Sequence, residues 1–215
     1  MILSGVRPRV SAAILAGGRA RRFGGADKAA LRLGAARVID RQLAALSGVT
    51  DDIVIVGNDP ARYAALRLPV LPDVIPGAGA LGGIYTALVR ARSDVVLIVA
   101  CDLPFVSAAL FERLVGDLTD DVDAVIPRSA RGLEPLCAVY HRRCAASART
   151  RIDRGELQVS DLAREIQVRE LGGAALAAYD PDGRLFVNLN TPHDYARARA
   201  WIEGNTEPPQ NPITN

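Results

Sequence analysis

The sequence is poor in lysine, histidine and cysteine. Of its 26 lysine and arginine residues only Lys28 is a lysine, and it has two histidines and three cysteines. Cys101, Cys137 and Cys144 form no CxxC pair, so the chain offers neither a zinc-finger type of site nor a disulfide framework. Unpaired cysteines in small number are typical of a protein of the reducing cytoplasm, which is the location that we expect.

Long apolar runs and strong charge are also missing. No apolar run approaches the about 18 residues that span a membrane, so we expect no membrane partner. The net charge of +2 is too small to indicate a nucleic-acid partner. With 215 residues, 49% of them hydrophobic, the composition fits one globular domain. We expect a leader at 1–9, a single domain at 10–203 and a disordered, proline-rich tail at 204–215.

The one lysine ends a glycine-rich basic segment, residues 17–28, that follows the apolar run 10–16. Backbone N–H groups of such a loop can hold phosphates, and an ammonium fits among phosphate oxygens as a point charge, unlike a planar guanidinium. The spacing is not that of a Walker A loop. Lys28 could also be a chance survivor on a surface loop. The candidate phosphate-binding residues are Gly17, Gly18, Arg22 and Lys28.

Apolar strands alternate with amphipathic helices along most of the chain. Strands are expected at 10–16, 52–56, 69–72, 94–100, 122–126 and 135–140. Helices are expected at 36–46, 81–92, 107–116, 141–153 and 192–202, while 155–185 has no clear pattern. This alternation predicts a three-layer, Rossmann-like α/β fold with helices on both faces of a mostly parallel, mixed sheet. Ligands of such sheets bind at the carboxyl ends of the strands.

The most apolar strand, 94–100, leads into a candidate metal ligand, Asp102. A carboxylate at a strand end beside a phosphate loop suits Mg²⁺, which binds through one or two carboxylates and substrate phosphates. The alternative is that Asp102 caps the helix at 107–116, but Ser107 is better placed for that role. We therefore expect Mg²⁺ as the cofactor, held by Asp102.

A second glycine-rich segment imitates a dinucleotide-binding fingerprint. Gly77, Gly79 and Gly82 form a literal GxGxxG, and Asp102 lies 20 residues after Gly82. Three prolines interrupt the segment that should be the preceding strand, which a central strand would not accept. That interpretation also leaves the loop 17–28 without a role, so a nicotinamide-dinucleotide enzyme is the weaker alternative.

Other polar residues lie at strand and helix boundaries. Asp73 opens the second glycine-rich segment, where it could contact a ribose or a base, or simply start a turn. Asn188 and Asn190 precede the last helix, and turn or capping roles are equally open for them. Thr191 is expected to cap that helix, with Pro192 at its first position.

Six short segments between residues 15 and 194 carry most of these candidates. They are LAGGRARRFGGADKAAL (15–31), LPD (71–73), GALGGI (79–84), ACDLPFVS (100–107), EPLCAVY (134–140) and NLNTPHD (188–194). In order and content they resemble the molybdenum cofactor guanylyltransferases, nucleotidyltransferases of the glycosyltransferase-A-like α/β fold. The first segment is the most specific, because cytidylyl and sugar-phosphate relatives typically show Leu-Ala-Ala-Gly in place of Leu-Ala-Gly-Gly.

The resemblance implies transfer of GMP from GTP to the terminal phosphate of molybdopterin, with release of pyrophosphate. It assigns GTP binding to Leu15, Ala16, Gly17, Gly18, Lys28, Asp73 and Asp102, with Asp102 also on Mg²⁺. It places Arg22, Gly25, Asn188 and Asn190 on the pterin side, and charge neutralisation by Lys28, Arg22 and the Mg²⁺ held by Asp102 would be the catalytic contribution. Val56 stands about where the family often has an asparagine, and Asn58 is the candidate replacement at the nucleoside.

Two rival functions stay open at this point. A related nucleotidyltransferase could use CTP or act on a sugar phosphate, and a nucleotide-binding protein could share the loop without turnover. Pyrophosphate release with GTP, CTP and ATP would separate these possibilities.

Overall fold

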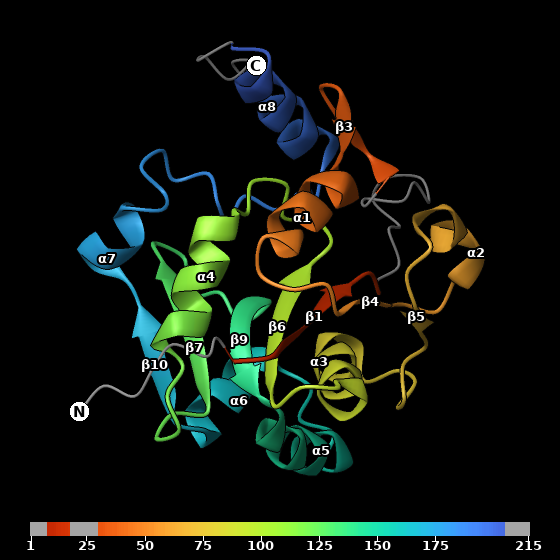
Figure 1. Ribbon diagram of the computed structural model, residues 1–215, viewed down its shortest axis with the longest axis vertical. Coiled ribbons are helices and arrows are strands. Elements are labelled where there is room, and N and C mark those ends of the chain that lie inside the picture. Colours follow the sequence, from red (N-terminus) through yellow and green to blue (C-terminus); the bar gives the residue numbers. More distant parts are fainter. Residues whose placement is uncertain (1–7, 18–29, 205–215) are drawn as a thin grey trace, which may run out of the picture.

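The computed structural model describes residues 8–17 and 30–204. Within them, eight strands form one mixed sheet at the centre of the molecule (Figure 1). In spatial order the strands are β10 (Val168–Leu171), β7 (Ala124–Ser129), β9 (Cys137–His141), β6 (Val95–Ala100), β1 (Val10–Leu15), β4 (Ile53–Val56) and β5 (Val70–Leu71), with β8 (Gly132–Leu133) paired to β7.

The central strands run parallel. β1 pairs in parallel with β4 on one side and β6 on the other, and β4 pairs in parallel with β5. β9 is inserted antiparallel between β6 and β7. The predicted mostly parallel, mixed sheet is therefore confirmed.

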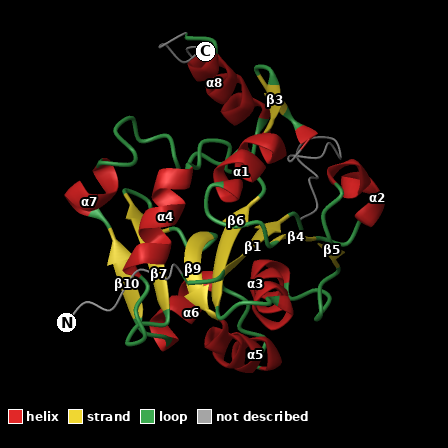
Figure 2. Cartoon of the chain, in the orientation of Figure 1, coloured by secondary structure: helices red, strands yellow, loops and turns green. Residues whose placement is uncertain are grey.

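Helices cover both faces of the sheet (Figure 2). One face carries α1 (Val38–Ser47), α4 (Ala108–Asp117) and α7 (Gly173–Ala177), and the other carries α3 (Gly79–Arg90), α5 (Ala145–Asp153) and α6 (Val159–Glu165). Alternate residues of β1 point into the two cores: Ala12 and Ile14 belong to the first, Ala13 and Leu15 to the second. Burial on both faces explains the continuous apolar runs, and the three-layer architecture is confirmed.

The structure corrects the start of one predicted helix and shows the elements of a segment for which none was predicted. The helix expected from residue 36 begins at Val38, because Ala36–Arg37 form β3, which pairs with β2 (Arg32–Leu33) around a turn at Gly34. Gly34 has a φ of 64°, which favours glycine. The segment 155–185, which had no clear pattern, contains the short elements α6, β10 and α7.

The last helix, α8 (Pro192–Ile202), begins as predicted, with Thr191 as its N-cap and Pro192 at its first position. It packs beside the β2–β3 hairpin through a small separate core that includes Leu33, Leu189 and Ala198. Helix α2 (Pro60–Tyr63) leads towards β5. Among the described residues, no helix is both long and apolar enough to cross a membrane.

Candidate functional site

The carboxyl ends of four parallel strands meet along one edge of the sheet. The strand order places Asp73, Asn58, Gly17 and Asp102 along this edge, after β5, β4, β1 and β6 respectively. The chain adds β4 and β5 on one side of β1 and then returns to place β6 on the other side. Such a reversal opens a crevice at the strand ends, where ligands of open α/β sheets bind.

Part of the predicted site lies outside the described residues. Gly18, Arg22, Gly25 and Lys28 belong to the segment 18–29, and the roles predicted for them remain predictions from the sequence.

Asp102 lies in a turn whose backbone is held by hydrogen bonds to several elements. The N–H of Leu103 donates to the carbonyl of Ala100 at 3.3 Å and closes the turn. The N–H of Cys101 donates to the carbonyl of Leu15 at 3.1 Å, which joins the turn to the end of β1. The N–H of Leu189 donates to the carbonyl of Asp102 at 3.0 Å. The half-buried carboxylate is thus presented from a backbone with little freedom to move.

Asp102 does not cap the following helix. The hydroxyl of Ser107 accepts a hydrogen bond from the N–H of Leu110 at 3.3 Å and caps α4, as predicted. The capping alternative for Asp102 is therefore excluded.

Asn58 and Asp73 form a reciprocal pair between the ends of β4 and β5. The side-chain Nδ2 of Asn58 donates to Oδ2 of Asp73 at 2.8 Å, and the N–H of Asp73 donates to Oδ1 of Asn58 at 3.0 Å. The N–H of Val74 donates to the hydroxyl of Thr86 at 2.9 Å, which fixes the next residue against α3. The sequence did not predict this pairing, which holds the Asp73 carboxylate in one orientation at the edge.

At the end of β1, the side chains turn away from the edge or are absent. Leu15 is buried in the core under α3, and its carbonyl already accepts the bond from Cys101. The N–H of Ala16 donates to the carbonyl of Val56 at 2.8 Å. Gly17 is exposed, and a Cβ added there would have no described heavy atom within 4 Å. A nucleoside at this position would meet mainly backbone.

The two asparagines predicted for the pterin side lie next to the Asp102 turn. Asn188 and Asn190 are half-buried and flank Leu189, whose N–H binds the carbonyl of Asp102. The N–H of Asn190 donates to the carboxylate of Asp194 at 3.2 Å. The start of α8 therefore anchors this segment beside the turn.

Two residues that support the site were not predicted from the sequence. Thr86 and Leu189 act through their hydroxyl and backbone N–H respectively. Thr86 is fully buried within the apolar face of α3, so a polar residue in an apolar helical stripe was the signal available. A backbone contact such as that of Leu189 has no signal in the sequence.

Two of the three cysteines cannot provide a nucleophile at this site. No disulfide joins the three cysteines, all of which lie among the described residues, and Cys137 and Cys144 are buried. Burial raises the pKa of the Cys144 thiol to about 12 and that of Cys137 well above its usual range, so both stay protonated at neutral pH.

The dinucleotide interpretation fails on topology. It requires the strand before GxGxxG and the strand ending in Asp102 to be neighbours in the sheet. Here the strand before is the two-residue edge strand β5, and β4 and β1 separate it from β6.

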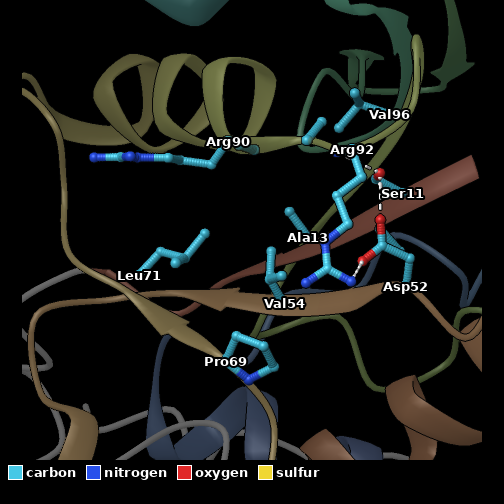
Figure 3. A pocket seen from close by; sticks show the side chains of 12 residues that line it. Ser11, Ala13, Asp52, Val54, Pro69, Leu71, Arg90, Arg92 and Val96 are labelled. Atoms are coloured by element: carbon cyan, nitrogen blue, oxygen red, sulfur yellow. Dashed lines mark hydrogen bonds and ion pairs between the residues drawn. The ribbon is translucent and has the colours of Figure 1, made fainter.

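A groove lies between α3 and strands β4 and β5, at the end of the sheet opposite the carboxyl edge (Figure 3). The hydroxyl of Ser11 donates to Asp52 at 2.6 Å and accepts from the N–H of Arg92 at 3.1 Å, so its bonds are used within the chain. The groove encloses about 130 Å³, less than the roughly 300 Å³ at the lower end of ligand pockets. The carboxyl edge therefore remains the candidate site.

Fold and edge together define an α/β protein of the class that binds its ligands at the switch point of the sheet, here beside β1. Residues 12–170 match the family described as the MobA-like NTP transferase domain, and the chain belongs to this family. The family resemblance predicted from the six segments is thereby confirmed.

Individual relatives agree with this assignment. The chain is 37% identical to the molybdenum cofactor guanylyltransferase of Desulfosudis oleivorans over 194 residues, covering 90% of this chain and 96% of that protein. The structure of molybdopterin-guanine dinucleotide biosynthesis protein A from Archaeoglobus fulgidus matches with a TM-score of 0.77 and 27% identity, covering 90% and 99% of the two chains. 4-Diphosphocytidyl-2C-methyl-D-erythritol synthase from Anaerococcus prevotii, at 15% identity, a TM-score of 0.69 and coverage of 91% and 96%, shares the fold alone.

Proposed function

We propose that this chain transfers GMP from GTP to the terminal phosphate of molybdopterin and releases pyrophosphate. The observation that carries the proposal is that two neighbouring parallel strands end side by side at the switch point of the sheet. β1 leads into Leu-Ala-Gly, and β6 leads into the turn that carries Asp102 and is fixed by backbone hydrogen bonds. The guanylyltransferase name of the relative from Desulfosudis oleivorans, aligned over nearly the whole chain, supports the same conclusion.

The residues at the edge fit a Mg²⁺ ion bound together with the nucleotide. Mg²⁺ prefers oxygen ligands, keeps several waters and binds through one or two carboxylates plus substrate phosphates. In the described part of the chain, no three His, Cys, Asp or Glu side chains gather as a metal site of their own. Asp102 would supply the carboxylate, and the ion would supply neutralisation of phosphate charge.

The proposed reaction joins two anions, so its main demands are alignment and charge neutralisation. An oxygen of the molybdopterin phosphate forms a bond to the α-phosphorus of GTP, and the bond from that phosphorus to the bridging oxygen of pyrophosphate breaks. The Asn58–Asp73 pair would hold the nucleoside, and the Asp102 turn would fix the triphosphate. Lys28 and Arg22 remain the predicted cations for the phosphates. The attacking phosphate is largely ionised at pH 7, so no general base is required.

The direct test is pyrophosphate release by the purified protein with molybdopterin and either GTP, CTP or ATP. Release with GTP, dependent on molybdopterin and Mg²⁺, is the expected result. Faster release with CTP would overturn the choice of base and indicate a cytidylyltransferase. Binding of GTP without release under any of these conditions would indicate a nucleotide-binding protein without turnover.

A further inference from the structure

Helix α1 contains a buried polar side chain that the proposed reaction does not use. Gln42 is fully buried on the apolar face of the helix, between Ile39 and Leu46. Its Nε2 donates to the carbonyl of Ala100 at 2.7 Å and to the carbonyl of Leu103 at 3.0 Å. Its Oε1 has no hydrogen-bond partner within the described residues.

The two acceptors of Gln42 are the first and last residues of the turn that presents Asp102. Because both are carbonyl oxygens, the side chain must direct its NH₂ group towards them, since only that group donates. One side chain therefore braces both ends of a four-residue turn from a different element of the fold. The middle of the same turn is held by the bonds to Leu15 and Leu189 described above.

A general core role does not explain a glutamine at this position. Burying an amide oxygen without a partner is unfavourable, and the neighbouring positions on this face of α1 are filled by isoleucine and leucine. The two bonds that Gln42 makes through its NH₂ group both go to the turn. What Gln42 adds over an apolar side chain is the placement of Ala100 and Leu103, and hence of Cys101 and Asp102 between them.

We propose that Gln42 is a positioning residue for Asp102, which holds the turn so that the carboxylate meets the metal-bound nucleotide. This inference rests on the proposed function, in which Asp102 contacts Mg²⁺ and GTP. It adds a residue 60 positions away in sequence whose amide determines how well that contact is made.

The test compares Gln42→Met with Leu46→Val. Methionine keeps a similar volume but donates no hydrogen bond, while Leu46 lies one turn along the same buried face and serves as the matched control. We expect Gln42→Met to raise the Mg²⁺ concentration for half-maximal pyrophosphate release by about tenfold, the lower end of the range for residues that orient a metal ligand. Leu46→Val should lower Tm without shifting that concentration.

A second readout does not depend on turnover. Hydrogen exchange of the amides of residues 101 and 103 should be faster in Gln42→Met than in Leu46→Val, because their turn has lost its brace. The fluorescence of Trp201 provides a spectroscopic signature of the same change in the turn. Phe105 lies just beyond the turn, and the centroids of its ring and the Trp201 ring are 5.8 Å apart in an edge-to-face arrangement. If Gln42→Met does not fold, Gln42→Leu places on this face of α1 the kind of side chain that Leu46 already provides, and it cannot donate to either carbonyl.

The outcomes separate the two proposals. Unchanged Mg²⁺ dependence in Gln42→Met and Gln42→Leu, at a loss of Tm equal to that of Leu46→Val, would overturn the positioning role. An unmodified protein that releases no pyrophosphate from GTP would overturn the proposed function, while amide exchange and Trp201 fluorescence would still show whether Gln42 holds the turn.

Discussion

The carboxyl edge of the sheet offers two acidic side chains to a nucleotide, and they are held in different ways. Asp73 is fixed through its own carboxylate, which accepts a hydrogen bond from Asn58. The backbone of the turn that carries Asp102 is fixed by hydrogen bonds to β1 and to Leu189. These backbone hydrogen bonds do not depend on the charge of the Asp102 side chain, so they should persist when that charge is removed.

Asp102→Asn should therefore separate function from stability. The substitution keeps the shape and removes the charge, and we expect Mg²⁺-dependent turnover to fall by roughly a hundredfold or more, with little change in Tm. Pyrophosphate release and thermal unfolding measure the two effects. Asp94→Asn, at the exposed amino end of β6, is the control and should keep full activity. If Asp102→Asn unfolds while its native fraction keeps full specific activity, Asp102 has a structural role instead.

The Asn58–Asp73 pair predicts an effect on binding. Asn58→Ala removes both hydrogen bonds that orient Asp73. If binding of GTP loses about 1 kcal/mol of free energy as a result, its affinity falls several-fold. We expect KM for GTP to rise about fivefold to tenfold with kcat nearly unchanged. Steady-state kinetics at saturating molybdopterin measure this split, with Asp59→Asn as the neighbouring control. A fall in kcat at constant KM would place Asn58 in the chemical step.

Lys28 is predicted from the sequence alone to contact the phosphates. Lys28→Arg keeps the charge but replaces a compact ammonium by a planar fork, which should not fit among phosphate oxygens in the same way. We expect turnover to fall by at least about a hundredfold with the fold intact, because charge placement is the main catalytic demand. Turnover measurements and circular dichroism test both parts. An arginine variant with near-normal rates would remove the argument for a phosphate contact.

At the scale of elements, the start of α8 matters because it also anchors the segment 188–190. The Asp194 carboxylate accepts bonds from the N–H groups of Asn190 and Thr191 and from the hydroxyl of Thr191. Burial opposes its ionisation, but these hydrogen bonds hold the pKa of Asp194 below its usual value. A depressed folded-state pKa stabilises the fold above the unfolded-state pKa, and this contribution disappears as the pH falls through the folded-state value.

Asp194→Asn should accordingly destabilise the protein in a pH-dependent way. We expect a loss of roughly 1 kcal/mol at pH 7, the typical value of a helix cap. The difference should begin to shrink below about pH 4, the usual pKa of an aspartate in the unfolded chain. It should disappear as the pH falls through the lower folded-state pKa, where Asp194 takes up a proton and resembles asparagine. Urea unfolding at pH 7 and pH 3 measures it, with Glu203→Gln at the exposed end of α8 as control. An equal loss at both pH values would show that charge is not involved.

The elements that the sequence predicted well are those whose burial is repeated over many residues. β6, and β1 apart from Ser11, consist of apolar residues because both faces of these strands are covered, and their ends could be located to within one or two residues. The β2–β3 hairpin and the elements within 155–185 are too short to show a period.

Individual site contacts were harder to predict than the site's location. A buried strand followed by an acidic residue indicated Asp102, because the carboxyl ends of parallel strands share one edge. The bonds from Gln42 to the turn, and from Asn58 to Asp73, join residues far apart in sequence, and only the fold determines which residues meet.

At the scale of the whole molecule, the fold does not determine the base. The chain shares its architecture with 4-diphosphocytidyl-2C-methyl-D-erythritol synthase, a protein of the cytidylyl type by name. We therefore expect the choice of guanine to depend on the edge of the site, where Leu15 is buried and Gly17 offers no side chain. A purine needs more room than a pyrimidine, and glycine lets the backbone approach it closely.

Gly17→Ala should narrow the preference for GTP. A pocket built from backbone donors and acceptors can reject a wrong base by a few powers of ten, because its polar groups are then left unpaired. We expect the unmodified protein to prefer GTP over CTP and ATP by at least about a hundredfold in kcat/KM, with molybdopterin as acceptor. The added methyl group meets no described atom within 4 Å, so the variant should fold normally. A change in the ratio of kcat/KM values would then reflect contact between the methyl group and the nucleotide. Competition between GTP and CTP measures the ratio, and an alanine variant with an undiminished ratio would show that the base is selected elsewhere.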